Sequence, residues 1–263
     1  MIVKQLMSKR LVTIDVDRNL RDAKALMEKN RISRLLVKDD EKIIGMITER
    51  DIANRLGTWK ERRISDARIF ISSTYSSNLI KINQNQDISL AAGEMLKRGI
   101  SSLAVCDNGN VVGILTKTDV IKALKDSKVK VRDWMSRPVV TLGVGAEVLH
   151  ARILMLRNGI KRVPIVLGNR LVGIVTEKDI AKALGLFRKL AEGRHWDEKM
   201  KKVLVEQIMS RDIITVDPEQ SLGGVVEIMF SKKVSGLPVV ENDRLVGIVT
   251  KTDLVRVVAE SKF

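Results

Sequence analysis

One ten-residue pattern occurs four times in the chain, and this repetition constrains the fold more than any other feature of the sequence. Each copy has two or three apolar residues, a glycine, two more apolar residues, a threonine, two variable residues and an aspartate. The pattern ends at Asp51, Asp119, Asp179 and Asp253. A β-branched residue opens a second apolar run 13 residues before each motif glycine, at Ile32, Ile100, Ile160 and Val234. The chain is therefore expected to contain four equivalent structural units.

A Met-Ser pair precedes the motif glycine by 38 residues in three copies, beginning at Met7, Met135 and Met209. Copy 2 has no such pair. Ile64 lies 49 residues before Gly113, whereas Val3 lies 42 residues before Gly45. We therefore predict that copy 2 carries seven extra residues in its Ser/Thr-rich stretch ISSTYSSN.

Each copy predicts the same order of elements. In copy 1 a short strand at 11–16 precedes an amphipathic helix at 20–30, and two adjacent strands follow at 34–37 and 42–48. An acidic turn joins these two strands, and a last helix begins near the motif aspartate. One face of the first helix carries Leu20, Ala23, Leu26 and Met27. A unit of about 60 residues cannot bury both faces of its sheet alone, so the copies are expected to pair.

This order of motifs resembles the CBS domain, the module named after cystathionine β-synthase. The similar features are the Met-Ser pair, the first strand and helix, the run VSGLPVV, and GIVT followed by an aspartate, and they extend over nearly the whole chain. The resemblance implies an α/β (α+β) fold of four β-α-β-β-α repeats. Copies 1 and 2, and copies 3 and 4, are expected to form two tandem pairs in a disc-like arrangement. Similar proteins are stand-alone prokaryotic CBS proteins and the γ subunit of AMP-activated protein kinase.

We place the copies at residues 1–58, 62–126, 129–186 and 203–261, with a charged linker at 187–202. The alternation of residues supports the pairing. Copies 1 and 3 read T-E-R/K-D and carry Arg34 and Arg162 at the start of the central strand. Copies 2 and 4 read T-K-T-D and carry Ser102 and Gly236 there. A pair of units, and not a single unit, was therefore duplicated.

The Thr-x-x-Asp motif allows two interpretations. A threonine followed three residues later by an acidic residue, just before an apolar run, is the capping-box pattern of a helix N-terminus. The same N-terminus presents free N–H groups and a positive dipole end, beside which an anion binds. The resemblance implies that the four motif aspartates, Asp51, Asp119, Asp179 and Asp253, bind the ribose hydroxyls of a nucleotide.

The resemblance also implies contacts to phosphate and base. The phosphate candidates are Thr48, Arg34, Thr116, Thr176, Arg162, Thr250 and Lys161. The base candidates are Val12, Thr13, Ile32, Ser33, Ile100, Ser101, Val140, Thr141, Ile160, Ile214, Thr215, Val234 and Ser235. A core strand or a solvated arginine is the alternative role for each. Because copies 1 and 3 combine Thr, Asp and Arg, they are predicted to hold the stronger sites, with base contacts borrowed from their partner copies.

The chain has 47 basic and 32 acidic residues, a net charge of +15, which favours an anionic partner. Nucleic acid is the alternative to a nucleotide. It is not favoured, because only 3% of residues are aromatic and neither a helix-turn-helix nor a zinc-finger signature is present.

One cysteine and two histidines exclude a disulfide framework, a thiolate metal cage and a histidine zinc site. No catalytic cluster recurs, so we predict no enzymatic activity and no catalytic cofactor. The expected function is regulatory: binding of AMP, ADP or ATP in clefts between paired repeats, energy sensing, and signalling to an unidentified protein partner. S-adenosylmethionine or another adenosyl ligand is the alternative, and a homodimer is left open. Without a long apolar run or a signal-peptide core, we expect a cytoplasmic protein that does not contact a membrane.

Overall fold

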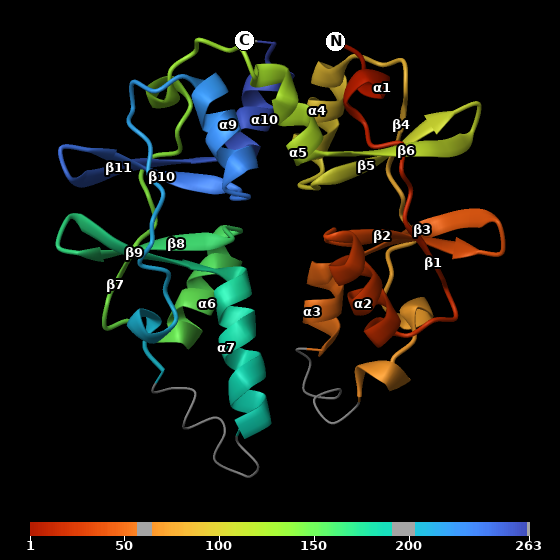
Figure 1. The fold of residues 1–263 in the computed structure, drawn as a ribbon, viewed down its shortest axis with the longest axis horizontal. Coiled ribbons are helices and arrows are strands. Elements are labelled where there is room, and N and C mark those ends of the chain that lie inside the picture. The colour runs from red at the N-terminus through yellow and green to blue at the C-terminus, as the bar shows by residue number, and fades with distance from the viewer. Residues whose placement is uncertain (57–64, 191–202, 262–263) are drawn as a thin grey trace. The chain divides into compact units, whose positions relative to one another are not determined.

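The chain forms two compact units in the computed structural model, which describes residues 1–56, 65–190 and 203–261 (Figure 1). Unit 1 comprises Met1–Ala123 together with the stretch from Val258, and unit 2 comprises Leu124–Val257. Unit 1 therefore holds copy 1 and nearly all of copy 2, and unit 2 holds copy 3 and nearly all of copy 4. Among the described helices, none combines the length and the apolar composition needed to cross a membrane.

Unit 1 contains two three-stranded sheets, one from each copy, of order β1-β2-β3 and β4-β5-β6. In each sheet a short strand lies parallel to the first strand of an antiparallel hairpin. The elements of copy 1 are α1 (Val3–Leu6), β1 (Thr13–Asp15), α2 (Leu20–Asn30), β2 (Arg34–Asp39), β3 (Lys42–Thr48) and α3 (Glu49–Leu56). Those of copy 2 are η2 (Asp66–Arg68), η3 (Ile71–Ser73), β4 (Lys81–Asn83), α4 (Ile88–Lys97), β5 (Ser102–Asp107), β6 (Asn110–Thr116), α5 (Lys117–Val120) and η4 (Ile121–Leu124).

The strands of unit 2 form one sheet of order β10-β11-β9-β8-β7, in which Arg244 pairs with Arg170. In copy 4 the predicted first strand is reduced to one parallel bridge between Val216 and Val239. The elements of copy 3 are η5 (Val131–Asp133), β7 (Leu142–Gly143), α6 (Val148–Asn158), β8 (Arg162–Leu167), β9 (Arg170–Thr176) and α7 (Glu177–Leu190). Those of copy 4 are η6 (Val205–Gln207), α9 (Leu222–Ser231), β10 (Gly236–Glu241), β11 (Arg244–Thr250) and α10 (Lys251–Ala259).

Helices cover the outer face of each sheet in unit 1, with α2 and α3 beside β1-β2-β3 and α4 and α5 beside β4-β5-β6 (Figure 1). The apolar face predicted for α2 points into this core: Leu20, Ala23 and Met27 are buried, and Leu26 packs against the same cluster. Asn19 caps the helix by accepting a hydrogen bond from the N–H of Asp22 at 3.0 Å. The amphipathic pattern therefore predicted this helix and its orientation correctly.

The helix α7 continues to Leu190 and so passes residue 186, where we placed the end of copy 3. The remainder of the predicted charged linker, residues 191–202, lies outside the described residues.

Within each unit, the first residues of each copy form backbone hydrogen bonds with the other copy. The N–H of Val3, at the start of copy 1, donates to the carbonyl of Gln86 in copy 2 at 2.9 Å. The N–H of Ile71 in copy 2 donates to the carbonyl of Arg18 in copy 1 at 2.8 Å. In unit 2 the corresponding bonds run from Val131 to Gln220 and from Val205 to Ala146. Each copy therefore completes the backbone pairing of its partner.

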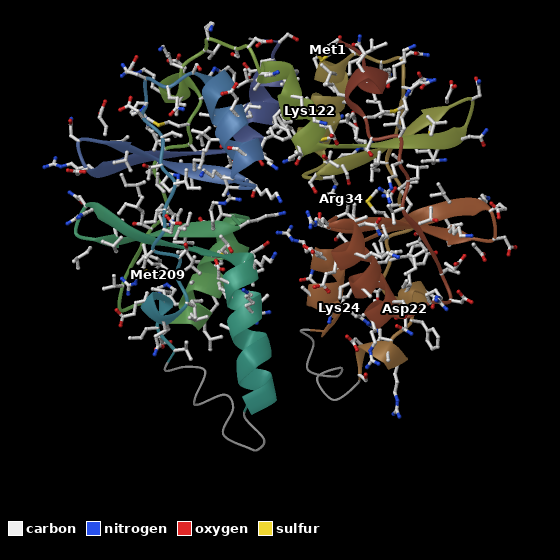
Figure 2. All side chains as sticks on the ribbon, in the orientation of Figure 1. Met1, Asp22, Lys24, Arg34, Lys122 and Met209 are labelled. Atoms are coloured by element: carbon white, nitrogen blue, oxygen red, sulfur yellow. The ribbon has the colours of Figure 1, made fainter. Side chains whose placement is uncertain are left out.

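The motif glycines leave room for a large side chain from the partner copy. A Cβ added at Gly113 would lie 2.6 Å from the Sδ of Met7, closer than any van der Waals contact. The same overlap would occur between Gly173 and Met209, which Figure 2 labels, and between Gly247 and Met135. The methionine of each Met-Ser pair thus packs on the partner copy. The serine that follows it forms an antiparallel bridge beside the glycine.

The predicted insertion in copy 2 is wrong. Tyr75 lies 38 residues before Gly113 and takes the place of the methionine, because its ring and the carbonyl of Ser76 fill the space above Gly45. Ile71 lies 42 residues before Gly113 and is buried as Val3 is. The stretch ISSTYSSN is therefore the regular start of copy 2, and the extra residues precede it. The spacing from Ile64 therefore gave the wrong start for copy 2. The true start has no methionine to mark it, because the space above the glycine accepts an aromatic ring as well as a methionine.

Fragments that contain one whole unit should fold, whereas a single copy should not. We expect residues 1–125 and 130–263 to unfold cooperatively in urea when expressed separately. We expect residues 1–58 to remain unfolded, because that fragment lacks the leading segment supplied by copy 2. Circular dichroism during urea titration measures this. Cooperative unfolding of 1–58, or failure of both longer fragments to fold, would contradict the pairing.

Candidate functional site

In copies 1, 2 and 3 the motif threonine and aspartate form a reciprocal capping box. In copy 4 the aspartate accepts the same two bonds, but the Oγ1 of Thr250 accepts from the N–H of Thr252 at 3.2 Å. The Oδ2 atom of Asp51 accepts hydrogen bonds from the N–H of Thr48 at 2.8 Å and from its Oγ1 at 2.7 Å. The N–H of Asp51 lies 3.3 Å from the Thr48 Oγ1 that accepts its hydrogen bond. Both bonds to Oδ2 recur in the other copies, from Thr116 to Asp119, from Thr176 to Asp179 and from Thr250 to Asp253.

The capping interpretation is therefore confirmed, and it limits what each group can offer a ligand. The threonine hydroxyl has one proton and donates it to the carboxylate, so a phosphate contact by Thr48, Thr116, Thr176 or Thr250 requires this bond to be given up. The aspartate Oδ2 already accepts two hydrogen bonds. A ribose hydroxyl would therefore approach the other oxygen, Oδ1.

In the even copies, which are copies 2 and 4, the Oδ1 atom of the motif aspartate already accepts a hydrogen bond. Copies 1 and 3 are the odd copies. Asp119 accepts from Lys122, labelled in Figure 2, with the Nζ at 2.8 Å, and Asp253 accepts from the Oγ of Ser136 at 2.8 Å. Asp253 is only 2% exposed. Asp51 and Asp179 are half-buried. The odd-copy carboxylates are therefore the more accessible acceptors for ribose hydroxyls.

The strand openings predicted to contact a base are fixed directly to the motif. In copy 1 the N–H of Glu49, the residue after the motif threonine, donates to the carbonyl of Ser33 at 2.9 Å. The equivalent bonds run from Lys117 to Ser101, from Glu177 to Lys161 and from Lys251 to Ser235. The apolar residues that precede these carbonyls are half-buried: Ile32, Ile100, Ile160 and Val234. The structure thus brings an apolar side chain and a backbone edge beside every Thr-x-x-Asp motif.

The first-strand candidates lie on the neighbouring strand of the same copy. The carbonyl of Val12 accepts a hydrogen bond from Leu36 at 3.1 Å, and Thr13 pairs with the same residue in the parallel register. Two further pairs directly precede β7 and the Val216 bridge: Val140 with Thr141, and Ile214 with Thr215.

Sequence reasoning missed the equivalent pair in copy 2, Ile80 and Lys81. The carbonyl of Ile80 accepts a hydrogen bond from Ala104 at 3.0 Å, as Val12 does from Leu36. Ile80 lies 33 residues before Gly113, the same spacing that separates Val12 from Gly45. This spacing was the signal that could have found it.

The guanidinium of Arg162 reaches from copy 3 to copy 4. The backbone of Arg162 pairs with the motif threonine of its own copy, Thr176. Its Nη2 donates to the Oγ of Ser235 at 2.5 Å, and the guanidinium occupies the space where a Cβ at Gly236 would lie. The strand opening of copy 4 thus leaves the space that this arginine fills.

Arg34 has the same position in unit 1. It pairs with the motif threonine Thr48, and its side chain lies between the two sheets (Figure 2). Burial lowers the pKa of the Arg34 guanidinium, and the charges of Asp119 and Glu49 act in the opposite direction. Burial likewise lowers the pKa of Arg162, and there the opposing charges are Asp253 and Glu177. Each arginine therefore lies in the field of an even-copy motif aspartate. The prediction had grouped it with the aspartate of its own copy.

The arrangement offers acceptors for hydroxyl groups, an apolar slot with a backbone edge, and a cation for an anionic group. Lys161 is exposed next to Arg162. In the part of the chain that the structure describes, no group of three or more His, Cys, Asp or Glu side chains could hold a metal ion. These groups together can bind a molecule that combines a ring, a diol and an anion.

The family model of the CBS domain matches residues 3–58, 71–126, 131–186 and 205–260. The protein MJ1225 of Methanocaldococcus jannaschii is 30% identical over 275 residues, which cover 97% of this chain and 98% of that protein.

Solved structures agree with this similarity. The crystal structure of MJ1225, described as that of a proposed archaeal homologue of γ-AMPK, has a TM-score of 0.77 at 26% identity and covers 97% of this chain and 99% of its own. A conserved protein from Pyrococcus horikoshii has a TM-score of 0.70 at 23% identity over 98% of this chain and 100% of its own, which shows the shared fold. Because the family model matches all four copies, and MJ1225 is similar over its whole length, the chain belongs to the CBS domain family.

Proposed function

We propose that the chain is a regulatory sensor that binds AMP, ADP or ATP at its Thr-x-x-Asp motifs and signals the bound state to a partner protein. One observation carries this proposal. In each unit a half-buried motif aspartate lies beside an apolar strand opening, and a half-buried arginine starts the adjacent strand. A nucleotide has three matching parts: the ribose hydroxyls, the base and the phosphate.

The geometry supports a specific role for each group. The ribose hydroxyls would donate to the Oδ1 atoms of Asp51 and Asp179. The base would lie against the half-buried strand openings and read their backbone edge. Arg34 and Arg162 would hold the phosphate, because a planar guanidinium gives two parallel charge-assisted hydrogen bonds.

We propose a regulatory role because the matched copies account for most of the chain and carry no repeated catalytic cluster. The similarity to MJ1225, described as a proposed homologue of γ-AMPK, supports a role in reporting nucleotide state to another protein. We place this function in the cytoplasm, where these nucleotides are abundant.

A nucleotide should raise the stability of the protein. A ligand that binds only the folded chain contributes about 2.7 kcal/mol at one hundred times its dissociation constant. Thermal melts with AMP, ADP, ATP and S-adenosylmethionine measure this effect and rank the ligands. Stabilisation by S-adenosylmethionine alone would redirect the proposal to that ligand.

Binding of random duplex DNA tests whether the net charge of +15 serves nucleic-acid binding. This binding should be weak, about 10⁻⁴ to 10⁻⁶ M at physiological salt. No stabilisation by any of the four ligands, together with tight sequence-selective DNA binding, would replace the proposal with a nucleic-acid function.

A further inference from the structure

In unit 2 the guanidinium of Arg162 lies between two motifs. In unit 2 the backbone of Arg162 pairs with Thr176, the motif threonine of copy 3. Its side chain contacts Ser235 and fills the space above Gly236, which itself pairs with Thr250, the motif threonine of copy 4. The same group can therefore turn toward a phosphate at either motif.

Unit 1 has an arginine at the same strand position. Arg34 pairs with Thr48, its Nη2 donates to the Oγ of Ser33 in its own copy at 3.5 Å, and its side chain lies between the two sheets of the unit (Figure 2). The Nη1 atom of Arg34 is buried and has no hydrogen-bond partner within the described part of the chain. A buried donor without a partner is unfavourable, so an anion that reached it would be bound strongly.

The even copies do not supply a second guanidinium at the equivalent position. The residues that pair with their motif threonines are Ser102 and Gly236. Arg256, on α10 of copy 4, instead forms an ion pair with the motif aspartate Asp253, at 3.6 Å from its Oδ1. Two nucleotides bound in one unit would thus bring two phosphates toward the one arginine that starts a central strand.

We infer that the two nucleotide sites of a unit share one guanidinium, so that a phosphorylated ligand at one motif weakens the binding of a phosphorylated ligand at the other. This inference rests on the proposed function. A hydrogen bond to a charged group contributes about 1.5–3 kcal/mol, which corresponds to a factor of about 10 to 150 in affinity. Adenosine, which lacks the phosphate, should show no such competition.

The experiment uses the intact chain and isothermal titration with AMP and adenosine. Asp51→Asn with Asp179→Asn weakens the odd-copy sites, so this background reports on the even-copy sites, whereas the background with all four motif aspartates reports mainly on the odd-copy sites. Arg34→Ala and Arg162→Ala are then introduced together into each background. A shared guanidinium predicts that AMP affinity falls at least 10-fold in both backgrounds, while adenosine affinity stays unchanged.

The control is Arg170→Ala, which removes an exposed arginine from the other end of the β8–β9 hairpin and should leave both ligands unaffected. Gly236→Ala tests the geometry with the arginine retained. Its added methyl group takes the space of the Arg162 guanidinium and should also weaken AMP in unit 2.

Loss of AMP affinity in only one background would mean that the arginine serves one site, and the inference would be wrong while the proposed function stands. Equal losses for AMP and adenosine would also overturn it. Absence of binding by both ligands to the unaltered chain would remove the proposed function itself.

Discussion

Replacing Gly45 by alanine should lower the free energy of unfolding of unit 1 by about 3 kcal/mol, the upper end of the usual cost of overpacking a core. The added Cβ would overlap the carbonyl of Ser76, which is backbone, and the ring of Tyr75. The carbonyl of Ser76 cannot move without breaking its bridge to Met46. Urea denaturation followed by circular dichroism measures the change.

A matched glycine provides the control. Gly93 lies within the helix α4, and a Cβ there would meet nothing within 4 Å. Gly93→Ala should therefore stabilise the protein slightly, by about 0.5–1 kcal/mol. Similar destabilisation by both substitutions would show that the space above Gly45 is not the cause.

Unit 2 allows a sharper version of the same prediction. At Gly173 the overlap is with the side chain of Met209 only. In a double-mutant cycle Gly173→Ala and Met209→Ala should therefore be less destabilising together than the sum of the two, with a coupling of about 0.5–3 kcal/mol. At Gly45 the substitution Tyr75→Ala should give little rescue, because the Ser76 carbonyl remains.

Asp51→Asn together with Asp179→Asn should weaken AMP binding about 10- to 150-fold and leave the protein folded. An asparagine oxygen can still accept the capping bonds of Thr48 and Thr176, while its NH₂ group replaces the ribose acceptor. The magnitude follows from about 1.5–3 kcal/mol for a charge-assisted hydrogen bond. Isothermal titration measures the affinity, and a thermal melt without ligand confirms the fold.

The even-copy aspartates supply the matched control for this prediction. Because Oδ1 of Asp119 and Asp253 is bonded to Lys122 and Ser136, the same substitution there should cost much less AMP affinity. Selectivity for AMP over its 2′-deoxy analogue should fall only with the odd-copy changes. Equal losses from the two pairs of substitutions would contradict the ranking of the sites.

The order of elements could be predicted from the sequence because the determinants are local. The spacing between the strand opening and the motif glycine is set by one hairpin, and the Thr-x-x-Asp spacing is set by one helical turn. The capping boxes and the strands beside them therefore follow from residues close together in the chain. The apolar face of α2 follows from periodicity alone.

The contacts between copies could not be predicted in this way. Ser136 reaches Asp253 across 117 residues, and no local pattern indicates that bond. The docking of Arg162 on Gly236 depends on the missing side chain of a glycine 74 positions further along. The role of Tyr75 could not be predicted from a Met-Ser pattern, because the space above Gly45 accepts a large aromatic side chain as well as a methionine.

Native mass spectrometry of the intact chain titrated with AMP tests the central claim most directly. We predict complexes with bound AMP at micromolar concentrations of the nucleotide. Their population should fall sharply when Asp51, Asp119, Asp179 and Asp253 are all changed to asparagine. An unaltered chain that binds no adenine nucleotide, or a fourfold variant that binds AMP as well as the unaltered chain, would contradict the assignment of these motifs as nucleotide sites.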